Sequence, residues 1–298
     1  MNEPEAIRKL KAMAEALVAP PIPETVPPEP APPEPVQPDR PEWSARDEIT
    51  QDKRFRVVWD AERLSPILRT LKAMEVEDAV FYLDKTGIEV LRMDNSRVSL
   101  LNVFCPKEAF AEFDVPGTLA FTVNPADVAR VLPKKGTVEV SMTGDGSVRV
   151  NDGQGAYSFS DLTPEGDGRY PSVPKMVFSA KFTVAAKKFR EVVNGMGAAD
   201  AVVLSAGQGN LTFESRGEGL NATVALAECS SGEAKAAYNP ELLMRFLKAG
   251  FGDELAGEFG TRLPIVLRCD LRPGSADYWL APRVDPCDLR PGSADPCE

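Results

Sequence analysis

The alternation of apolar and polar positions between residues 80 and 104 is the clearest pattern in this chain. Apolar side chains occupy every second position on both sides of residues 84–87, which is the period of half-buried strands. The tetrapeptide Asp-Lys-Thr-Gly at 84–87 has the composition of a turn, so the flanking strands should form a hairpin. Small polar residues then break the pattern, and residues 97–104 have high strand propensity. The pattern therefore predicts three successive antiparallel strands.

A weaker copy of the surrounding sequence occurs in the second half of the chain. Residues 55–83 align with residues 182–204, because each segment reads as a strand, a helix-period segment, an acid-Ala-Val junction and another strand. Residues 121–132 and 236–247 also match, each as a strand, an Asn-Pro break and a helix. A repeat of this length predicts two similar domains rather than a solenoid of short units. The expected fold class is α+β, with antiparallel sheets and two helices in each domain.

Changes in composition along the chain predict where these domains begin and end. The segment 163–175 is rich in Pro, Gly and charge, and proline fills half of the positions between 20 and 41. The expected segments are a short amphipathic helix at 1–19, a proline-rich disordered linker at 20–54, a first domain at 55–162, an interdomain connecting loop at 163–175, a second domain at 176–284 and a C-terminal tail at 285–298. The proline-rich arm is either a plain extension or an arm that recruits partners. The tail repeats residues 269–277 letter for letter at 287–295, and we assign this copy no function.

The residue types in the chain argue against an enzyme. Histidine is absent, which removes the usual general base, the Ser-His and Cys-His pairs and the commonest zinc ligand. No phosphate-binding or calcium-binding loop motif occurs, and the best-placed single acid, Asp94, is interpreted as a turn residue. We therefore expect no catalytic residue, no metal and no cofactor. The alternative from another class is an enzyme with an Asp or Lys site, which would need a deep pocket around a perturbed carboxylate.

The chain shows no transmembrane or secretory signal, and its five cysteines, which lack a CxxC spacing, are typical of reduced thiols. An intracellular protein is expected.

Charge is unevenly distributed along this acidic chain, whose formal net charge is −11. The four helix-period segments, 62–74, 125–135, 184–196 and 240–249, each contain more basic than acidic residues. Helices in equivalent places of both repeats would then collect positive charge on one face, which suits sequence-independent contact with DNA phosphates. The candidate DNA-binding residues are Arg69, Lys72, Arg130, Lys134, Lys135, Lys187, Lys188, Arg190, Arg245 and Lys248. The alternative is that each helix merely presents a solvated face.

Two motifs carry a resemblance to a known family. The run GIEVLRMDNSRVSL at 87–100 and the ending YWLAPRV at 278–284, together with the Asn-Pro-led helices, resemble the DNA sliding clamps of archaea and eukaryotes, the proliferating cell nuclear antigen family. The resemblance covers residues 55–284. It implies a clamp fold and a homotrimeric ring, in which basic helices surround double-stranded DNA. The strand at 154–162 would pair with the strand at 221–229 of the next subunit.

The resemblance also implies a function and a docking site. The ring would act as a DNA polymerase processivity factor in replication and repair, located with the DNA in the archaeal cytoplasm or nucleoid or in the eukaryotic nucleus. DNA polymerase, clamp loader, ligase and nuclease would bind through short peptides. The residues that match the family's docking pocket are Met93, Val98, Leu100, Leu162, Pro264, Trp279, Ala281 and Pro282.

Two features depart from the family pattern. Trp279 stands where tyrosine is usual, and Pro66 interrupts a predicted helix, which should therefore start late or bend. A subunit of a hetero-oligomeric ring and a monomeric processivity factor remain the alternative functions.

Overall fold

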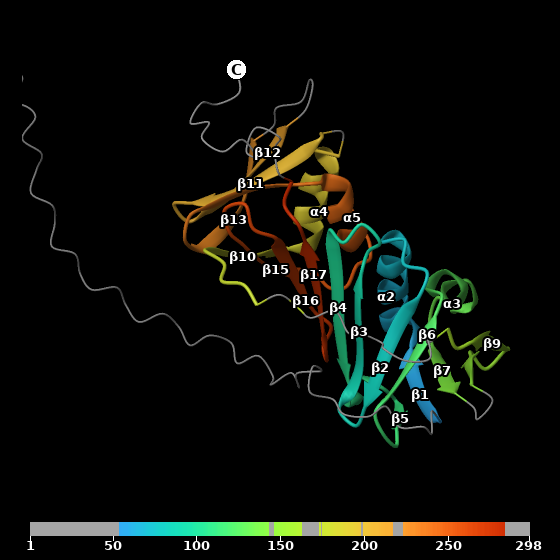
Figure 1. The fold of residues 1–298 in the computed structure, drawn as a ribbon. Helices are drawn as coiled ribbons and strands as arrows, with labels where there is room; N and C mark the ends of the chain where they lie inside the picture. Colours follow the sequence, from blue (N-terminus) through green and yellow to red (C-terminus); the bar gives the residue numbers. More distant parts are fainter. Residues whose placement is uncertain are drawn as a thin grey trace, which may run out of the picture. The chain divides into compact units, whose positions relative to one another are not determined.

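The computed structural model describes residues 54–142, 146–162, 173, 175–197, 199–216 and 223–283. All of these belong to one compact unit, Trp43–Glu298 (Figure 1). The predicted helix at 1–19, nearly all of the linker at 20–54, most of the connecting loop at 163–175 and the tail at 285–298 lie outside the described residues.

Two antiparallel sheets form the described fold, which confirms the predicted α+β class. One sheet has 12 strands in the order β14-β11-β12-β13-β10-β15-β16-β17-β4-β3-β2-β6, and the other has five in the order β5-β1-β7-β8-β9. The strands of the first half, residues 55–162, are β1 (Phe55–Asp60), β2 (Ala79–Asp84), β3 (Gly87–Met93), β4 (Ser99–Pro106), β5 (Glu112–Asp114), β6 (Leu119–Val123), β7 (Thr137–Met142), β8 (Ser147–Asn151) and β9 (Ala156–Ser160). The strands of the second half, residues 176–283, are β10 (Ala180–Ala185), β11 (Ala201–Gly207), β12 (Asn210–Arg216), β13 (Thr223–Ser231), β14 (Ala234–Tyr238), β15 (Glu254–Phe259), β16 (Ile265–Asp270) and β17 (Ser275–Leu280).

The three strands predicted between residues 80 and 104 are present as β2, β3 and β4. In the first turn, the Asp84 carboxylate accepts hydrogen bonds from the Thr86 and Gly87 amides at 2.7 and 3.3 Å. Gly87 is required there, because a Cβ atom at this position would lie 2.2 Å from the Cys105 carbonyl oxygen. In the second turn, buried Asp94 accepts from two backbone amides. Asp94 is therefore a turn residue, as predicted.

The predicted start of the third strand, at residue 97, is wrong by two residues. Arg97 has a φ of 59° and its amide bonds back to the Asp94 carbonyl, so the turn extends to the start of β4 at Ser99.

Side-chain caps fix where three of the described helices begin. The helices are α2 (Ala61–Ala73), η2 (Lys107–Ala109, a 3-10 turn), α3 (Pro125–Val131), α4 (Ala186–Gly195) and α5 (Pro240–Leu247). Asp60 caps α2, and the equivalent residues Asn124 and Asn239 cap α3 and α5 by accepting from backbone amides of the first turn. Each Asn is followed by proline at the first helical position, where its missing N–H costs no hydrogen bond.

The expectation that Pro66 delays the start of the first helix is wrong. Helix α2 begins at Ala61 and runs through Pro66, which is buried. Proline inside a helix removes the hydrogen bond to the carbonyl four residues earlier, and its ring crowds that carbonyl. The Asp60 cap and the apolar face formed by Leu64, Ile67 and Leu71, all buried, hold the first turn in place despite that loss.

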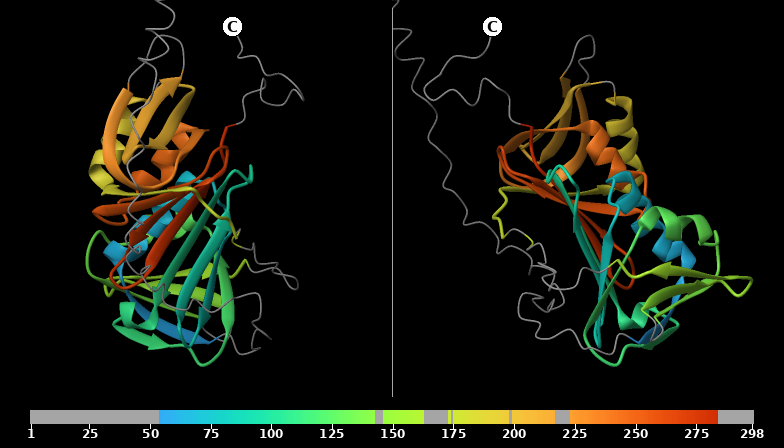
Figure 2. Two further views of the ribbon diagram at one scale, coloured as in Figure 1. Left: turned by 90° about the vertical axis from the view of Figure 1, so that its left-hand side faces the viewer. Right: turned by 45° about the vertical axis from the view of Figure 1, so that its right-hand side comes forward.

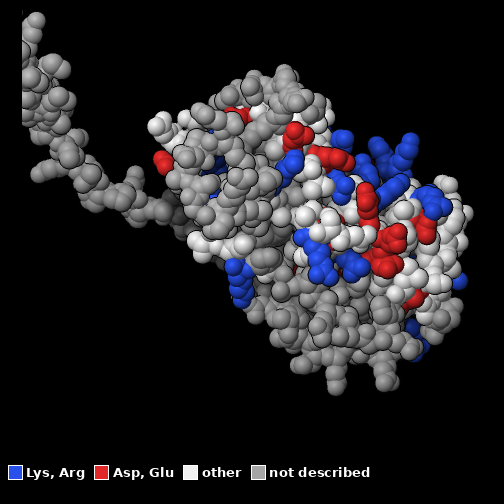
Figure 3. All heavy atoms as spheres, turned by 45° about the horizontal axis from the view of Figure 1, so that its top comes forward, with Lys and Arg blue, Asp and Glu red and all other residues white. Residues whose placement is uncertain are grey.

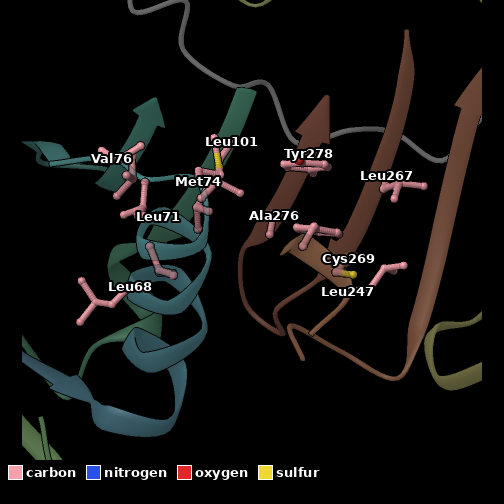
Figure 4. Packing of buried hydrophobic residues seen from close by; sticks show 14 of the residues in the cluster. Leu68, Leu71, Met74, Val76, Leu101, Leu247, Leu267, Cys269, Ala276 and Tyr278 are labelled. Carbon is pink, nitrogen blue, oxygen red and sulfur yellow. The ribbon is translucent and has the colours of Figure 1, made fainter. Parts of the chain in front are cut away.

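The two halves are joined through a single pair of strands within the described residues. β17 of the second half pairs with β4 of the first along its whole length, from Ser275 opposite Phe104 to Leu280 opposite Ser99. Buried residues of both halves consequently share one core, and Figure 4 shows Met74 of α2, Leu101 of β4 and Tyr278 of β17 within it. The four α-helices lie together on one side of the 12-stranded sheet (Figure 2), where α2 packs on α3, α4 on α5, and α2 meets α5.

The outer edges of the sheets differ in how they are covered. On β14, the Ala237 carbonyl accepts from the Arg283 amide at 2.8 Å, and the Lys235 carbonyl accepts from Arg262. On β6, Thr122 bonds to Asp161 and Leu162. The edge strand β5 is only three residues long. By contrast, β9 pairs with β8 on one side and with no other described strand, and such an open edge can accept another chain.

A glycine substitution tests the packing of the second half. A Cβ atom on Gly257 would lie 2.0 Å from the Phe182 ring, which stacks on Phe189 of α4. We expect Gly257→Ala to lower the free energy of unfolding by about 1–3 kcal/mol, because overpacking displaces this ring. Denaturant unfolding followed by circular dichroism measures the change.

The matched control is Gly207→Ala, since Gly207 also lies in a strand but has open space around its Cα. The control should alter the free energy of unfolding by no more than about 0.5 kcal/mol. Equal stability of both variants would show that Phe182 does not pack on Gly257 as described.

Candidate functional site

The basic residues predicted to contact DNA lie on the four α-helices and just beyond their C-terminal ends. They are Arg69 and Lys72 on α2, Arg130 on α3, Lys134 and Lys135 after α3, Lys187, Lys188 and Arg190 on α4, Arg245 on α5 and Lys248 at its C-cap. All are exposed except Arg190 and Arg245, which are partly buried. Each helix turns its apolar residues toward the sheet, which leaves the basic ones on the opposite side. We call this surface the helical face.

Acidic side chains interrupt the positive charge of the helical face. Figure 3 shows Lys and Arg side chains close together with Asp and Glu side chains among them. Arg130 forms an ion pair with Asp127 on the same helix. Lys72, Lys187, Lys188 and the remaining lysines of the set form no ion pair with another described residue. These lysines could contact an anion without giving up an existing partner.

Two arginines of the predicted set bond across the junction between the halves. The Arg69 Nη2 atom of α2 donates to the Ala249 carbonyl oxygen beyond α5 at 2.9 Å. The Arg245 Nη2 atom of α5 lies 3.6 Å from a carboxylate oxygen of Glu75, which follows α2. The sequence did not indicate these contacts, because they join residues that are distant in the chain.

A cavity of about 760 Å³ opens at this junction. Its lining comes from the ends of α2 and α4 and from α5, and consists of Arg69, Ala73, Glu75, Asn194, Gly197, Pro240, Glu241, Met244, Arg245, Lys248 and Ala249. The cavity therefore lies in the middle of the helical face and carries charges of both signs.

A small apolar cluster lies on the other side of the 12-stranded sheet. Three of the predicted docking residues, Met93, Leu100 and Trp279, belong to it. They are neighbours across β3, β4 and β17, because Met93 is paired with Leu100 and Leu100 with Trp279. We call this group the outer cluster.

Sequence reasoning missed four members of the outer cluster: Leu91, Val266, Val173 and Phe178. Strand alternation could have indicated Leu91, which lies two positions before Met93, and register could have indicated Val266, which pairs with Trp279. The Phe178 ring packs on Trp279 with centroids 5.9 Å apart. This contact depends on the path of the connecting segment, which no sequence pattern specifies.

The other predicted docking residues lie at the ends of neighbouring strands. The Val98 carbonyl accepts from the Ala281 amide at 2.8 Å, and Pro282 follows. Pro264 immediately precedes β16. Leu162 is not part of the outer cluster, because its amide bonds to Thr122 at the β6 edge and leaves its side chain 46% exposed.

Burial keeps two cysteine thiols and one tyrosine hydroxyl in their protonated forms. Burial raises the pKa of the Cys105 and Cys269 thiols to about 12, and likewise that of the Tyr278 hydroxyl. All three therefore stay protonated near neutral pH. Within the described residues there is no group of three or more Cys, Asp or Glu side chains that could hold a metal ion, and no helix there is long and apolar enough to cross a membrane.

Comparison with known proteins gives consistent matches. Residues 58–145 match the family model of the proliferating cell nuclear antigen N-terminal domain. The DNA polymerase sliding clamp of Archaeoglobus fulgidus is 25% identical over 242 residues, which cover 77% of this chain and 98% of that protein. DNA polymerase sliding clamp 1 of Sulfolobus acidocaldarius is 27% identical over 248 residues, which cover 77% and 100%.

Solved structures with the same fold include clamps bound to a nuclease segment and to another clamp. The C-terminal region of FEN-1 bound to A. fulgidus PCNA matches with a TM-score of 0.72 at 22% identity, covering 78% of this chain and 99% of that one. The PCNA2–PCNA3 complex of Sulfolobus tokodaii matches with a TM-score of 0.70 at 22% identity, covering 77% and 100%. Sequence motifs, sheet topology and these matches agree: the chain has the clamp fold and, over about three quarters of its length, is similar to the DNA sliding clamps of the proliferating cell nuclear antigen family.

Proposed function

We propose that this protein is a DNA polymerase processivity factor, a clamp that encircles double-stranded DNA and tethers replication and repair enzymes to it. The observation that carries the proposal is the helical face, where helices of both halves lie side by side and carry exposed basic side chains. Proteins named DNA polymerase sliding clamp match nearly their whole length to this chain, which supports the same activity here.

Two strands with unpaired stretches support assembly into a ring. Among the described strands β9 pairs only with β8, and Tyr157, the second residue of β9, is 42% exposed. β13 pairs with β12 over most of its length, but with β10 only through Cys229 and Ser231. The rest of β13 is therefore available on that side among the described strands. Pairing of β9 with β13 of the next subunit is a head-to-tail contact, which closes into a ring when the rotation between subunits is right.

A homotrimer is the proposed form of the ring, and a hetero-oligomeric ring is the second candidate. The head-to-tail contact uses two different surfaces of the same chain, so one kind of subunit suffices to close the ring. The S. tokodaii structure, a complex of PCNA2 with PCNA3, supports the second candidate, since those two related chains assemble with each other.

The basic residues of the helical face would contact DNA phosphates without reading the sequence. Lysine side chains on the exposed sides of α2 and α4 reach outward as flexible point charges, which suits weak contacts that re-form as the clamp slides. Retention on DNA would come mainly from encirclement.

The outer cluster is the proposed docking site for short peptides of DNA polymerase, clamp loader, ligase and nuclease. The cluster lies on a sheet face away from the helices, and its members Met93, Val173 and Phe178 are only partly buried, so it can receive the apolar side chains of a peptide. The FEN-1 segment bound to the related A. fulgidus clamp supports a nuclease as one partner. In this role the protein has no catalytic activity of its own, and it acts where the DNA is, in the nucleoid or nucleus.

Light scattering tests the assembly. We expect a mass near three times 32.3 kDa for the wild type. Tyr157→Asp should shift the protein to monomer, because it places a charge at the open edge of β9. Gln208→Asp is the control, since it adds the same charge at an exposed turn. A wild-type monomer at all concentrations and salt levels would exclude the homotrimer and favour the hetero-oligomeric ring or the monomeric factor.

Binding to linear DNA at several salt concentrations tests the helical face. Each Ala substitution at Lys72, Lys187 or Lys188 should weaken binding severalfold and lower the slope of log affinity against log salt by about one per lost phosphate contact. Lys107→Ala is the control, because Lys107 is exposed on η2, outside the four α-helices. An unchanged slope in all three variants would exclude these lysines as phosphate contacts.

Calorimetric titration with a FEN-1 C-terminal peptide tests the outer cluster. Trp279→Ala should weaken binding by about tenfold or more, because it removes the largest apolar surface of the site. Trp279→Tyr retains an aromatic ring and should bind within about threefold of the wild type. Thermal unfolding of both variants distinguishes a damaged site from an unfolded protein. Full affinity in a folded Trp279→Ala variant would rule out this cluster as the docking site.

A further inference from the structure

The pairing of β4 with β17, which we call the seam, does not by itself fix the angle between the two halves. Other contacts must fix it. Hydrogen bonds between β4 and β17 set the register of the two strands. They do not set one angle, because neighbouring strands tolerate a range of twist, from about −10 to −35°. Contacts away from the seam must therefore decide how the second half is tilted against the first.

Side-chain packing on the helical side does not fill the junction. Helix α2 of the first half meets α5 of the second. The cavity of about 760 Å³ lies between them and is lined by both helices and by the end of α4. A close-packed interface would resist tilting through its many contacts. Where a cavity that is open to solvent lies along the junction, the two halves are held there more by polar contacts than by close packing.

Three arginines make polar contacts from one half to the other, and two of them, Arg69 and Arg245, line this cavity. Arg63 donates to the Arg272 carbonyl at 3.0 Å, Arg69 donates to the Ala249 carbonyl at 2.9 Å, and Arg245 pairs with Glu75. The Ala249 carbonyl lies just after the C-terminal end of α5, where a positive charge is favoured by the helix dipole. A planar guanidinium fixes direction as well as distance, which a lysine ammonium does not.

We propose that Arg63, Arg69 and Arg245 are positioning residues that set the angle between the halves, and thereby the curvature with which subunits close into a ring. Phosphate contact then falls to the lysines of the helical face, although Arg69 and Arg245 were predicted to share it. The inference rests on the proposed ring. Because the same angle recurs in every subunit, a small tilt accumulates around the ring and opposes closure at the last interface.

Substitution of Glu75 distinguishes a phosphate-binding role of Arg245 from a positioning role, because the two roles predict opposite effects. Glu75 is largely exposed, with 79% of its side chain accessible, so Glu75→Gln should not unfold the protein. If Arg245 bound phosphate, the substitution would release it, remove a negative charge and tighten DNA binding. If Arg245 is a positioning residue, the substitution weakens ring assembly and leaves the salt slope of DNA binding unchanged.

The experiment measures the ring's dissociation constant by light scattering, together with the salt slope, for Glu75→Gln, Arg69→Met, Arg245→Met and Arg245→Lys. We expect the first three to weaken assembly about two- to fivefold each, as suits polar contacts that are only partly buried, with the wild-type slope. Arg245→Lys keeps a charge opposite Glu75 and should recover part of the loss. Lys72→Ala is the matched control, with normal assembly and a reduced slope.

Hydrogen exchange keeps this inference distinct from the proposed function. The Glu75→Gln and Arg69→Met variants should exchange faster at the end of α2 and along α5, whether or not the protein encircles DNA. A wild type that forms no ring by itself would exclude the proposed homotrimer, while the exchange data would still decide whether these arginines hold the junction. Tighter DNA binding by Glu75→Gln with normal assembly, or unchanged exchange in both variants, would overturn the inference.

Discussion

The pairing of β4 with β17 is the contact on which the rest of the structure depends. It joins strands from opposite halves into one 12-stranded sheet, so that helices of both halves share a side and buried residues of both halves share a core. Without this pairing each half would expose a sheet edge and part of its apolar surface. The helical face and the outer cluster both require it, since each is assembled from the two halves.

Local patterns predicted the elements well, because their causes are local. Strand alternation identified β2 and β3, and the Asn-Pro pairs marked where α3 and α5 begin, since a capping side chain and a fixed φ act within one turn. The prediction at Pro66 was wrong because tertiary packing outweighed a local rule. The buried face of α2 stabilises a helix that the local rule would delay, and the sequence does not state how strongly a face is packed.

Which of the candidate site residues lie together in space could be anticipated only in part. Residues on one strand face, such as Leu100 and Trp279, could be grouped through the family motifs, and cross-strand register brings them together. Phe178 and the interdomain contacts of Arg69 and Arg245 could not be anticipated, because each depends on how distant segments lie in space. The charge of a helix can be read from its sequence. The sequence does not show whether an arginine on that helix already has a hydrogen-bond or ion-pair partner.

The outer cluster is built from residues of both halves, and docking at the cluster therefore affects how the halves hold together. Leu91 and Leu100 belong to the first half, whereas Val266 and Trp279 belong to the second, so the cluster exists only while the seam between β4 and β17 is closed. A peptide that binds there adds its binding energy to the closed seam, in the manner of any ligand that prefers the folded state. A docked enzyme would thus stabilise the pairing of β4 with β17 from the outer side of the sheet. A subunit in which these two strands separate would release its docked enzymes before it unfolds.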